Sequence, residues 1–265
     1  MRAAGIASPR TDAELLAAHV LAVPRGRLLL IDSFDLGQRS EFDSLIAARA
    51  RRIPLQHLIG SVAFGRIDLQ VGPGVFVPRP ETEQLVEWAL SVLGPGSPVV
   101  VDFCSGTGAI ALSIADARPD ARVIAVEQDP SALPWLRRNV ASVSPAVQVV
   151  EADVTAPSTL ASLDGTVDML LCNPPYVPDA TPVPVEVHAD PRVAVFGGAD
   201  GLDVIRPVAA RAGALLKPGG WLGLEHDESH AAKVAAIITA TGAFDQVVGQ
   251  DDLAGRPRFT IARHA

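Results

Sequence analysis

The stretch VVVDFCSGTGAIAL, Val99 to Leu112, decides the fold. A largely apolar run of strand type ends in a turn that contains Gly106 and Gly108, and an apolar helical segment follows. Glycine permits a tight turn and a close approach of the backbone to a ligand, while the helix N-terminus presents free N–H groups. The stretch predicts a nucleotide-type pocket, although any doubly wound domain also needs a tight first turn.

A regular alternation of strands and helices continues downstream. Runs of Val, Ile and Leu, such as residues 122–127 and 167–172, alternate with amphipathic helical segments, and two further strands close the chain. Buried runs of this kind mean a parallel sheet covered by helices on both faces, so we predict an α/β fold. Pro134 predicts a start near Ser131 or a distorted first turn for its helix, and Pro207 predicts a late start or a kink.

Upstream, residues 1–54 are predicted to form a small helical domain. Thr11 and Glu14 have the spacing of a capping box at the start of a first helix, and Ser40 is the predicted cap of a second. Each of these segments carries apolar residues at helical spacing.

Residues 55–78 are predicted to be a β-hairpin linker, because short β-rich pieces alternate there with glycines. The third domain is placed at residues 79–265. It opens with a helix that has Pro80 in its first turn and Glu81 at its positive end.

Charge and composition exclude several classes of protein. Thirty acidic against 22 basic residues leave a net charge of -8, which argues against stable nucleic-acid binding. The chain has no apolar run long enough to span a membrane and no signal-peptide core, so we expect a cytoplasmic protein. We also expect a monomer. Cys104 and Cys172 are too few for a disulfide scaffold and lack metal-ligand spacing, so we expect no metal and two reduced, dispensable thiols.

Acidic residues that follow the next two strands are candidate cofactor ligands. Glu127 comes nineteen residues after Gly108 and could accept hydrogen bonds from both ribose hydroxyls, although an acid at a strand end is often only solvated. Asp153 could reach the adenine side, with Val154 packed on the ring, or it could be a turn aspartate. The six residues from Cys104, CSGTGA, lack the third glycine of a dinucleotide fingerprint, which disfavours a dehydrogenase.

The segment Asn173–Pro174–Pro175–Tyr176 ends a strand that is expected to flank the same pocket. Proline fixes φ and has no N–H, so the segment is stiff and its carbonyls are free acceptors. The side-chain oxygen of Asn173 and the carbonyl of Pro174 can accept the two N–H bonds of a planar NH2 group, and Tyr176 can pack against its plane. Two such acceptors would orient the lone pair of an amide nitrogen and stabilise the positive charge that develops on methylation.

The chain resembles the protein-(glutamine-N(5)) methyltransferases that modify peptide-chain release factors, the PrmC/HemK family. The similarity runs from about Asp12 to the C-terminus and includes RARRIPLQHLIGSVAFG, VGPGVFVPRPETEQLV, VDFCSGTGAIALSIA, CNPPYVP, EVHADPRVAVFGGADGLDVI, LLKPGGWLGLEHD and DLAGRPRF, in the family's order. It implies a Rossmann-like fold with a seven-stranded, mostly parallel sheet that uses S-adenosylmethionine and releases S-adenosylhomocysteine. It also implies that the N-terminal helical domain engages the release factor.

The resemblance also implies roles for particular residues. On that analogy Asn173 to Tyr176 bind the glutamine side chain, and Arg79 and Glu81 flank the methionine end of the cofactor. The remaining cofactor residues implied are Cys104, Ser105, Gly106, Thr107, Gly108, Glu127 and Asn173.

Three departures from the family pattern stand out. Cys104 replaces the usual first glycine of the turn, which is tolerable if that position does not need a positive φ. Glu127 replaces the usual aspartate and can make the same pair of hydrogen bonds. The N-terminus is shorter by roughly one helix than is usual in the family.

Two alternatives remain open at this point. Asn-Pro-Pro-Tyr also occurs in amino-methyltransferases that act on adenine in DNA or RNA, and these must grip a polyanion. A catalytically silent cofactor-binding module is expected to lose this tetrapeptide, which is intact here.

Overall fold

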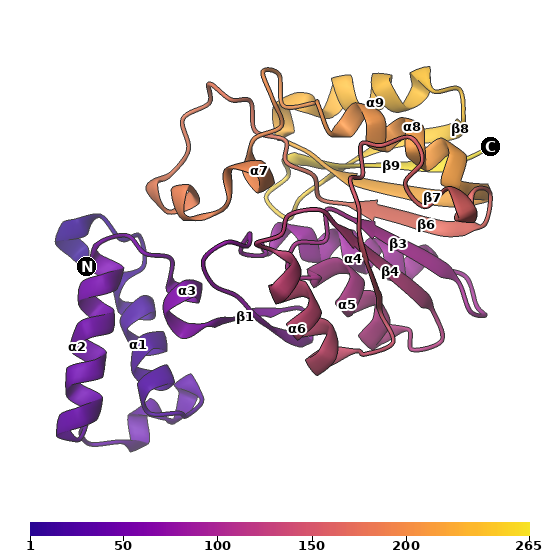
Figure 1. Cartoon of the computed structure of the whole chain (residues 1–265). Coiled ribbons are helices and arrows are strands. Elements are labelled where there is room, and N and C mark those ends of the chain that lie inside the picture. Colours follow the sequence, from indigo (N-terminus) through magenta and orange to yellow (C-terminus); the bar gives the residue numbers. More distant parts are fainter.

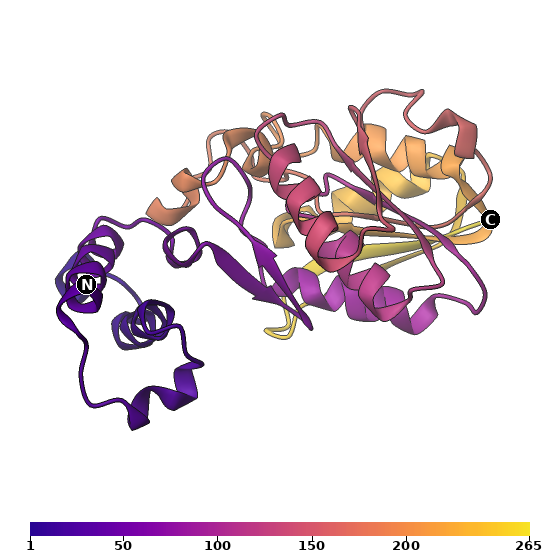
Figure 2. The same ribbon diagram turned by 60° about the horizontal axis from the view of Figure 1, so that its bottom comes forward.

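The structure is a computed structural model that describes residues 1–265. A group of N-terminal helices lies at one end of the molecule and an α/β body at the other, with a β-hairpin between them (Figure 1). A turned view shows the same separation (Figure 2). No helix has both the length and the apolar character that crossing a membrane requires.

The α/β body contains a seven-stranded sheet with the order β5-β4-β3-β6-β7-β9-β8. Only β9 runs antiparallel to its neighbours, so the predicted mostly parallel sheet is confirmed. The strand order changes direction between β3 and β6, where the carboxyl ends of an open sheet form a binding crevice. The strands are β3 (Val99–Phe103), β4 (Arg122–Glu127), β5 (Gln148–Glu151), β6 (Val167–Cys172), β7 (Leu216–Glu225), β8 (Phe244–Asp251) and β9 (Pro257–His264).

Helices cover both faces of the sheet, which explains why the central strands carry apolar residues on both of their faces. Val100 belongs to a core cluster with α4, α5 and α6, whereas Val101 belongs to a second cluster with α8 and α9. These helices are α4 (Glu81–Val92), α5 (Ala109–Ala117), α6 (Leu133–Val143), α8 (Ile205–Leu215) and α9 (Ala231–Ala240).

Prolines shape the starts of two of these helices. Pro134 and Pro207 both lie in the first turn, of α6 and α8 respectively. A proline there removes only an N–H that has no partner within the helix. The late start predicted for α8 is confirmed, and α6 begins two residues after the predicted Ser131.

Both predicted caps of the N-terminal helices were wrong. Helix α1 (Pro9–Val20) starts at Pro9 with Ser8 before it, so Thr11 lies inside the first turn. Glu14 forms ion pairs with Arg10 and Arg25 instead of closing a capping box. The fixed φ of proline at the first helical position favours the earlier start.

Helix α2 (Leu36–Ala50) also begins earlier than predicted. Asp35 caps it, with Gln38 completing a capping box, so Ser40 lies within the helix. The aspartate is a strong cap, and a start at that position adds a full helical turn.

The predicted hairpin consists of β1 (Ser61–Phe64) and β2 (Ile67–Gln70), paired antiparallel. A short helix that was not predicted, α3 (Leu55–Ile59), precedes it. The side chain of Asn139 on α6 bonds both backbone polar groups of Gln70 and the carbonyl of Thr107. Asn139 thus ties the hairpin to the glycine turn.

The long segment 177–201 folds back over the carboxyl end of the sheet. It contains a short 3-10 helix, η4 (Val185–Ala189), and one helical turn, α7 (Arg192–Val195). Val177 and Phe196 form a parallel bridge, and the Val177 carbonyl accepts from the N–H of Gly197. In both ribbon views this segment reaches toward the N-terminal helices (Figures 1 and 2).

Candidate functional site

A cavity of about 320 Å³ opens at the carboxyl ends of β3, β4 and β6, where the strand order changes direction. Most of the predicted cofactor turn lines it, together with parts of the 177–201 segment. The predicted site residues in its lining are Cys104, Ser105, Gly106, Thr107, Glu127, Val154, Asn173 and Pro175. Thr82, Phe76 and Phe196 also line the cavity, and none of them was predicted.

The glycine turn has three residues with positive φ: Cys104 at 57°, Gly106 at 54° and Gly108 at 87°. The positive φ of Gly108 favours glycine there, and a Cβ atom would also lie 2.8 Å from Cδ1 of Leu136 and displace that side chain. Cys104 occupies a conformation that favours glycine. From the sequence we expected cysteine to be tolerable here if the position did not need a positive φ. The φ of Cys104 is positive, so its replacement of the usual glycine is strained.

The carboxylate of Glu127 organises the turn. One oxygen accepts from the N–H of Gly106 at 2.8 Å, and the other accepts from the N–H groups of Gln128 and Asp129, both at 2.8 Å. Glu127 is 8% exposed and lines the cavity. Because a carboxylate offers about four lone-pair sites, it retains acceptor capacity on its cavity side.

Four predicted cofactor residues lie outside the cavity lining: Gly108, Asp153, Arg79 and Glu81. The carboxylate of Asp153 accepts from the N–H and the hydroxyl of Thr155, as a turn aspartate does. Glu81, the first residue of α4, lies 3.8 Å from Nη2 of Arg256 in the turn between β8 and β9.

Arg79 has two partners at the rim of the site. Its guanidinium pairs with Asp190, whose side chain is 1% exposed, and stacks 5.0 Å from the ring centroid of Phe76, which lines the cavity. Asp190 also accepts from the N–H of Val77 at 3.1 Å. Arg79 thereby holds the end of the linker against the 177–201 segment.

The Asn-Pro-Pro-Tyr segment contributes Asn173 and Pro175 to the cavity lining, whereas Pro174 and Tyr176 are not part of it. The tetrapeptide lies against the stretch FGGADG, residues 196–201. A Cβ atom at Gly201 would lie 2.3 Å from the carbonyl oxygen of Tyr176. This contact between two backbones explains why glycine stands at that position.

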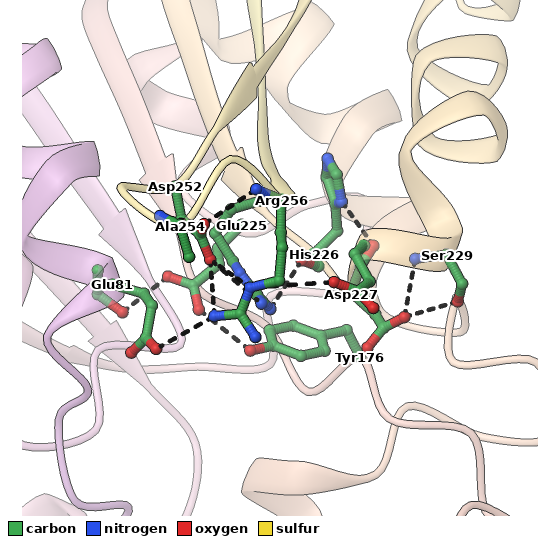
Figure 3. A network of polar contacts seen from close by, with 12 residues as sticks. Glu81, Tyr176, Glu225, His226, Asp227, Ser229, Asp252, Ala254 and Arg256 are labelled. Carbon is green, nitrogen blue, oxygen red and sulfur yellow. Dashed lines mark hydrogen bonds and ion pairs between the residues drawn. The ribbon is translucent and has the colours of Figure 1, made fainter.

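A buried hydrogen-bond chain connects the two ends of the tetrapeptide. Nδ2 of Asn173 donates to Oγ1 of Thr82 at 3.1 Å, and Oγ1 of Thr82 donates to Glu225 at 2.7 Å. The other oxygen of Glu225 accepts from the Tyr176 hydroxyl at 3.1 Å. Figure 3 shows the Tyr176 hydroxyl pointing toward Glu225, with Glu81, Asp252 and Arg256 beside them.

Burial shifts the ionisation of these groups. It raises the pKa of Glu225 to about 7, against the opposing hydrogen bonds from Thr82 and Tyr176. Burial and the neighbouring Glu225 charge raise the pKa of Tyr176. On β3, burial raises the pKa of Asp102 to about 7, and one of its carboxylate oxygens has no hydrogen-bond partner.

Sequence reasoning missed Thr82, Glu225 and Asp190. All three lie inside segments that resemble the family, namely PRPETE, LLKPGGWLGLEHD and EVHADP. Glu225 had a recognisable signal, because it is an acid at the end of a buried strand, as Glu127 is. Nothing local to Thr82 or Asp190 indicated which partner each would find.

Two family models match the chain. Residues 1–60 match the PrmC N-terminal domain, and residues 73–186 match the methyltransferase small domain. The first covers the N-terminal helices, and the second covers the cofactor turn and the Asn-Pro-Pro-Tyr segment.

Curated relatives match over nearly their whole length. A protein of Mycolicibacterium smegmatis named release factor glutamine methyltransferase is 52% identical, over 99% of this chain and 93% of its own. Proteins with the same name from Mycobacterium leprae and Corynebacterium glutamicum are 48% and 44% identical, over 98% of this chain in each case and 91% and 93% of their own.

Solved structures share the fold at low identity. The hMettl16 catalytic domain, solved in complex with the MAT2A 3'UTR hairpin 6, has a TM-score of 0.59 at 16% identity, over 83% of this chain and 81% of that one. A methyltransferase from Pyrococcus furiosus has a TM-score of 0.56 at 17% identity, over 86% and 98%. At these identities the similarity concerns the fold alone.

Proposed function

The chain belongs to the release factor glutamine methyltransferase family, and on that premise we propose that it methylates the glutamine of the Gly-Gly-Gln motif in peptide chain release factors. The methyl group comes from S-adenosylmethionine and is added to the side-chain amide nitrogen, N5. The observation that carries this proposal is Asn173, whose Nδ2 is committed to Thr82. Its Oδ1 is thereby free to accept an N–H at the cavity that Asn173 lines.

The residues at the cavity fit this cofactor. The positive-φ turn from Cys104 to Gly108 opens onto the N-terminus of α5, where free N–H groups favour a negatively charged group of a ligand. Glu127 offers a carboxylate for the ribose, with Val154 for the adenine ring and Asp153 beside it. Arg79 and Glu81 are proposed to flank the methionine end.

The reaction needs an oriented amide rather than a strong base. When bound, S-adenosylmethionine supplies an electrophilic methyl group. Asn173 and the carbonyl of Pro174 are proposed to accept the two N–H bonds of the glutamine amide, which directs its lone pair and stabilises the positive charge that develops on nitrogen. Pro175 and Tyr176 keep these acceptors in place, since the prolines fix φ and the Tyr176 hydroxyl is bonded to Glu225.

We also propose a division of labour along the chain. Residues 1–54 recognise the body of the release factor, residues 55–78 link the two parts, and residues 79–265 bind the cofactor and perform the transfer. The enzyme is proposed to act as a monomer in the cytoplasm. The net charge of -8 supports a protein substrate over a nucleic acid, and thus disfavours adenine as the acceptor.

Incubation of the full chain with labelled S-adenosylmethionine tests the proposal. Release factors and nucleic acids are offered in parallel, and the labelled product is analysed by mass spectrometry. We expect label on the Gly-Gly-Gln glutamine, none on a release factor in which that glutamine is replaced by glutamate, and none with Asn173→Ala at unchanged thermal stability. Label on nucleic acid alone would overturn the proposal, and normal turnover by Asn173→Ala would refute the role of Asn173.

A further inference from the structure

We propose that Glu225 is a positioning residue that acts through Thr82 to hold the Asn173 amide with its oxygen toward the reacting nitrogen, and through Tyr176 to anchor the other end of the tetrapeptide. The inference rests on the proposed function, because it concerns the orientation of the same acceptor.

The chain of groups is continuous, and its two central members are buried. Glu225 is 1% exposed and Thr82 is 3% exposed, so water does not compete for the hydrogen bond between them. The links from Asn173 to Thr82 and from Thr82 to Glu225 measure 3.1 and 2.7 Å. Figure 3 shows that the Glu225 carboxylate also faces the Tyr176 hydroxyl.

The direction of every hydrogen bond follows from the one group that can only accept. An ionised carboxylate has no proton, so the Thr82 hydroxyl must donate to Glu225. The lone pairs of Thr82 Oγ1 then face Asn173, which must turn its Nδ2 toward them. Oδ1 of Asn173 is left for the cavity, and this is the orientation that an N–H of the substrate requires.

Protonation of Glu225 would remove this constraint. A neutral carboxyl can donate to Thr82, whose hydroxyl can then donate to Asn173 and favour the reversed amide. The reversed amide presents N–H groups to the N–H groups of the substrate. Burial raises the pKa of Glu225 to about 7, which brings this change into a measurable range.

Charged groups from several elements face Glu225. Arg258 on β9 favours the ionised carboxylate and Glu81 on α4 opposes it. In the turn between β8 and β9, Asp252 pairs with Arg256 at 2.9 Å and lies 3.7 Å from Arg258. His226 is next to Glu225 in the sequence, but its Nε2 is hydrogen-bonded to Oγ1 of Thr260, at 2.9 Å, and not to Glu225.

A purely structural role would not require an acid at this position. A buried carboxylate with a raised pKa destabilises the folded state at neutral pH, and an apolar or amide side chain of similar volume would avoid that cost. A group that can only accept hydrogen bonds is, however, the simplest means of fixing the donor-to-acceptor direction of the series of hydrogen bonds that ends at Asn173.

Three variants and one control test the inference by the single-turnover rate of methyl transfer between pH 5.5 and 9. Thr82→Val keeps the shape but cannot relay the hydrogen bonds, so we expect a rate about 10- to 100-fold lower at pH 8, with affinity for the cofactor unchanged. Thr82→Ser should restore the rate to within about threefold, since it restores the hydroxyl. The exposed Thr166→Val is the matched control and should behave as the wild type.

Glu225→Gln supplies a readout that a structural role would not move. The wild-type rate should rise with pH through a midpoint near 7, the pKa to which burial raises Glu225. This rise should be absent from Glu225→Gln, which we expect to be slower than the wild type. A full rate in Thr82→Val, or a pH midpoint that persists in Glu225→Gln, would overturn the inference.

Side-chain amide NMR signals separate this inference from the proposed function. The signals of Asn173, assigned by their loss in Asn173→Asp, should titrate with a midpoint near pH 7 in the wild type but not in Glu225→Gln. If they titrate while the wild type leaves release factors unmodified, the proposed function fails and the positioning role stands. If methylation occurs but these signals do not titrate, the positioning role fails.

Discussion

The carboxylate of Glu186, in the segment 177–201, lies 2.7 Å from Nη2 of Arg52, next to the N-terminal helices. Its other oxygen lies 3.3 Å from Arg49, which is 8% exposed and also pairs with Asp12 at 2.7 Å. Although burial opposes its ionisation, a backbone hydrogen bond and the two arginines leave the pKa of Glu186 below its usual value. The segment that lines the cavity is therefore tied to the proposed recognition domain.

Breaking this tie should weaken recognition of the intact release factor. For Glu186→Ala we expect the KM for the release factor to rise roughly 5-fold, which corresponds to about 1 kcal/mol for a partly buried pair. The KM for S-adenosylmethionine should stay the same. Steady-state kinetics with Glu151→Ala, which breaks the exposed pair with Arg137 in the α/β body, provides the control. Equal effects of the two variants would argue against a coupling role for Glu186.

The strained turn predicts an unusual response at Cys104. Glycine would release about 1 kcal/mol of backbone strain at φ 57° but would lose side-chain contacts, so Cys104→Gly should unfold within about 1 kcal/mol of the wild type. Cys104→Val should be destabilised by about 2 kcal/mol or more, because a β-branched residue tolerates this conformation poorly. Urea denaturation measures both values, with Cys172→Val as the comparison in an ordinary strand. A smaller loss at position 104 than at position 172 would contradict the strain.

Asp102 should make stability depend on pH. Burial raises its pKa from 3.8 to about 7, so the folded state holds a proton that the unfolded state releases. The resulting stabilisation is complete below pH 3.8 and is lost as the pH rises through about 7. As the pH rises from 5 to 8, the free energy of unfolding of Asp102→Asn should therefore increase by about 2 to 3 kcal/mol relative to that of the wild type. Denaturation curves at several pH values check this, and a constant difference would show that Asp102 does not titrate in that range.

Asn139 should be a structural requirement of the hairpin linker. It is fully buried and makes three hydrogen bonds of 2.8 to 3.0 Å to the backbone of Gln70 and Thr107. Asn139→Ala leaves these groups unsatisfied, so we expect a loss of about 3 kcal/mol in the free energy of unfolding. Ser142→Ala, on the same helix, should cost less than about 1 kcal/mol. Hydrogen exchange at the Gln70 amide would report the loosening directly, and unchanged protection there would refute the role.

Patterns that are local to the chain predicted much of the structure. Strands β4 and β6 begin and end at the predicted residues, because their apolar runs are bounded by turn residues. The caps at Thr11 and Ser40 were wrong because Ser8 with Pro9, and Asp35 with Gln38, were available one turn earlier. A cap motif competes with its neighbours, and spacing alone does not decide which one begins the helix.

The sequence by itself determined the α/β architecture, the position of the glycine turn and the family resemblance, since these depend on periodicity and on motifs that are continuous along the chain. Only the tertiary structure decided that Cys104 adopts a left-handed conformation and that Glu225 reaches Asn173 through Thr82. Thr82 and Glu225 are separated by 143 positions. The chain has 30 acidic residues, so the packing of α4 against β7, rather than any local pattern, selects which of them receives the Thr82 hydroxyl.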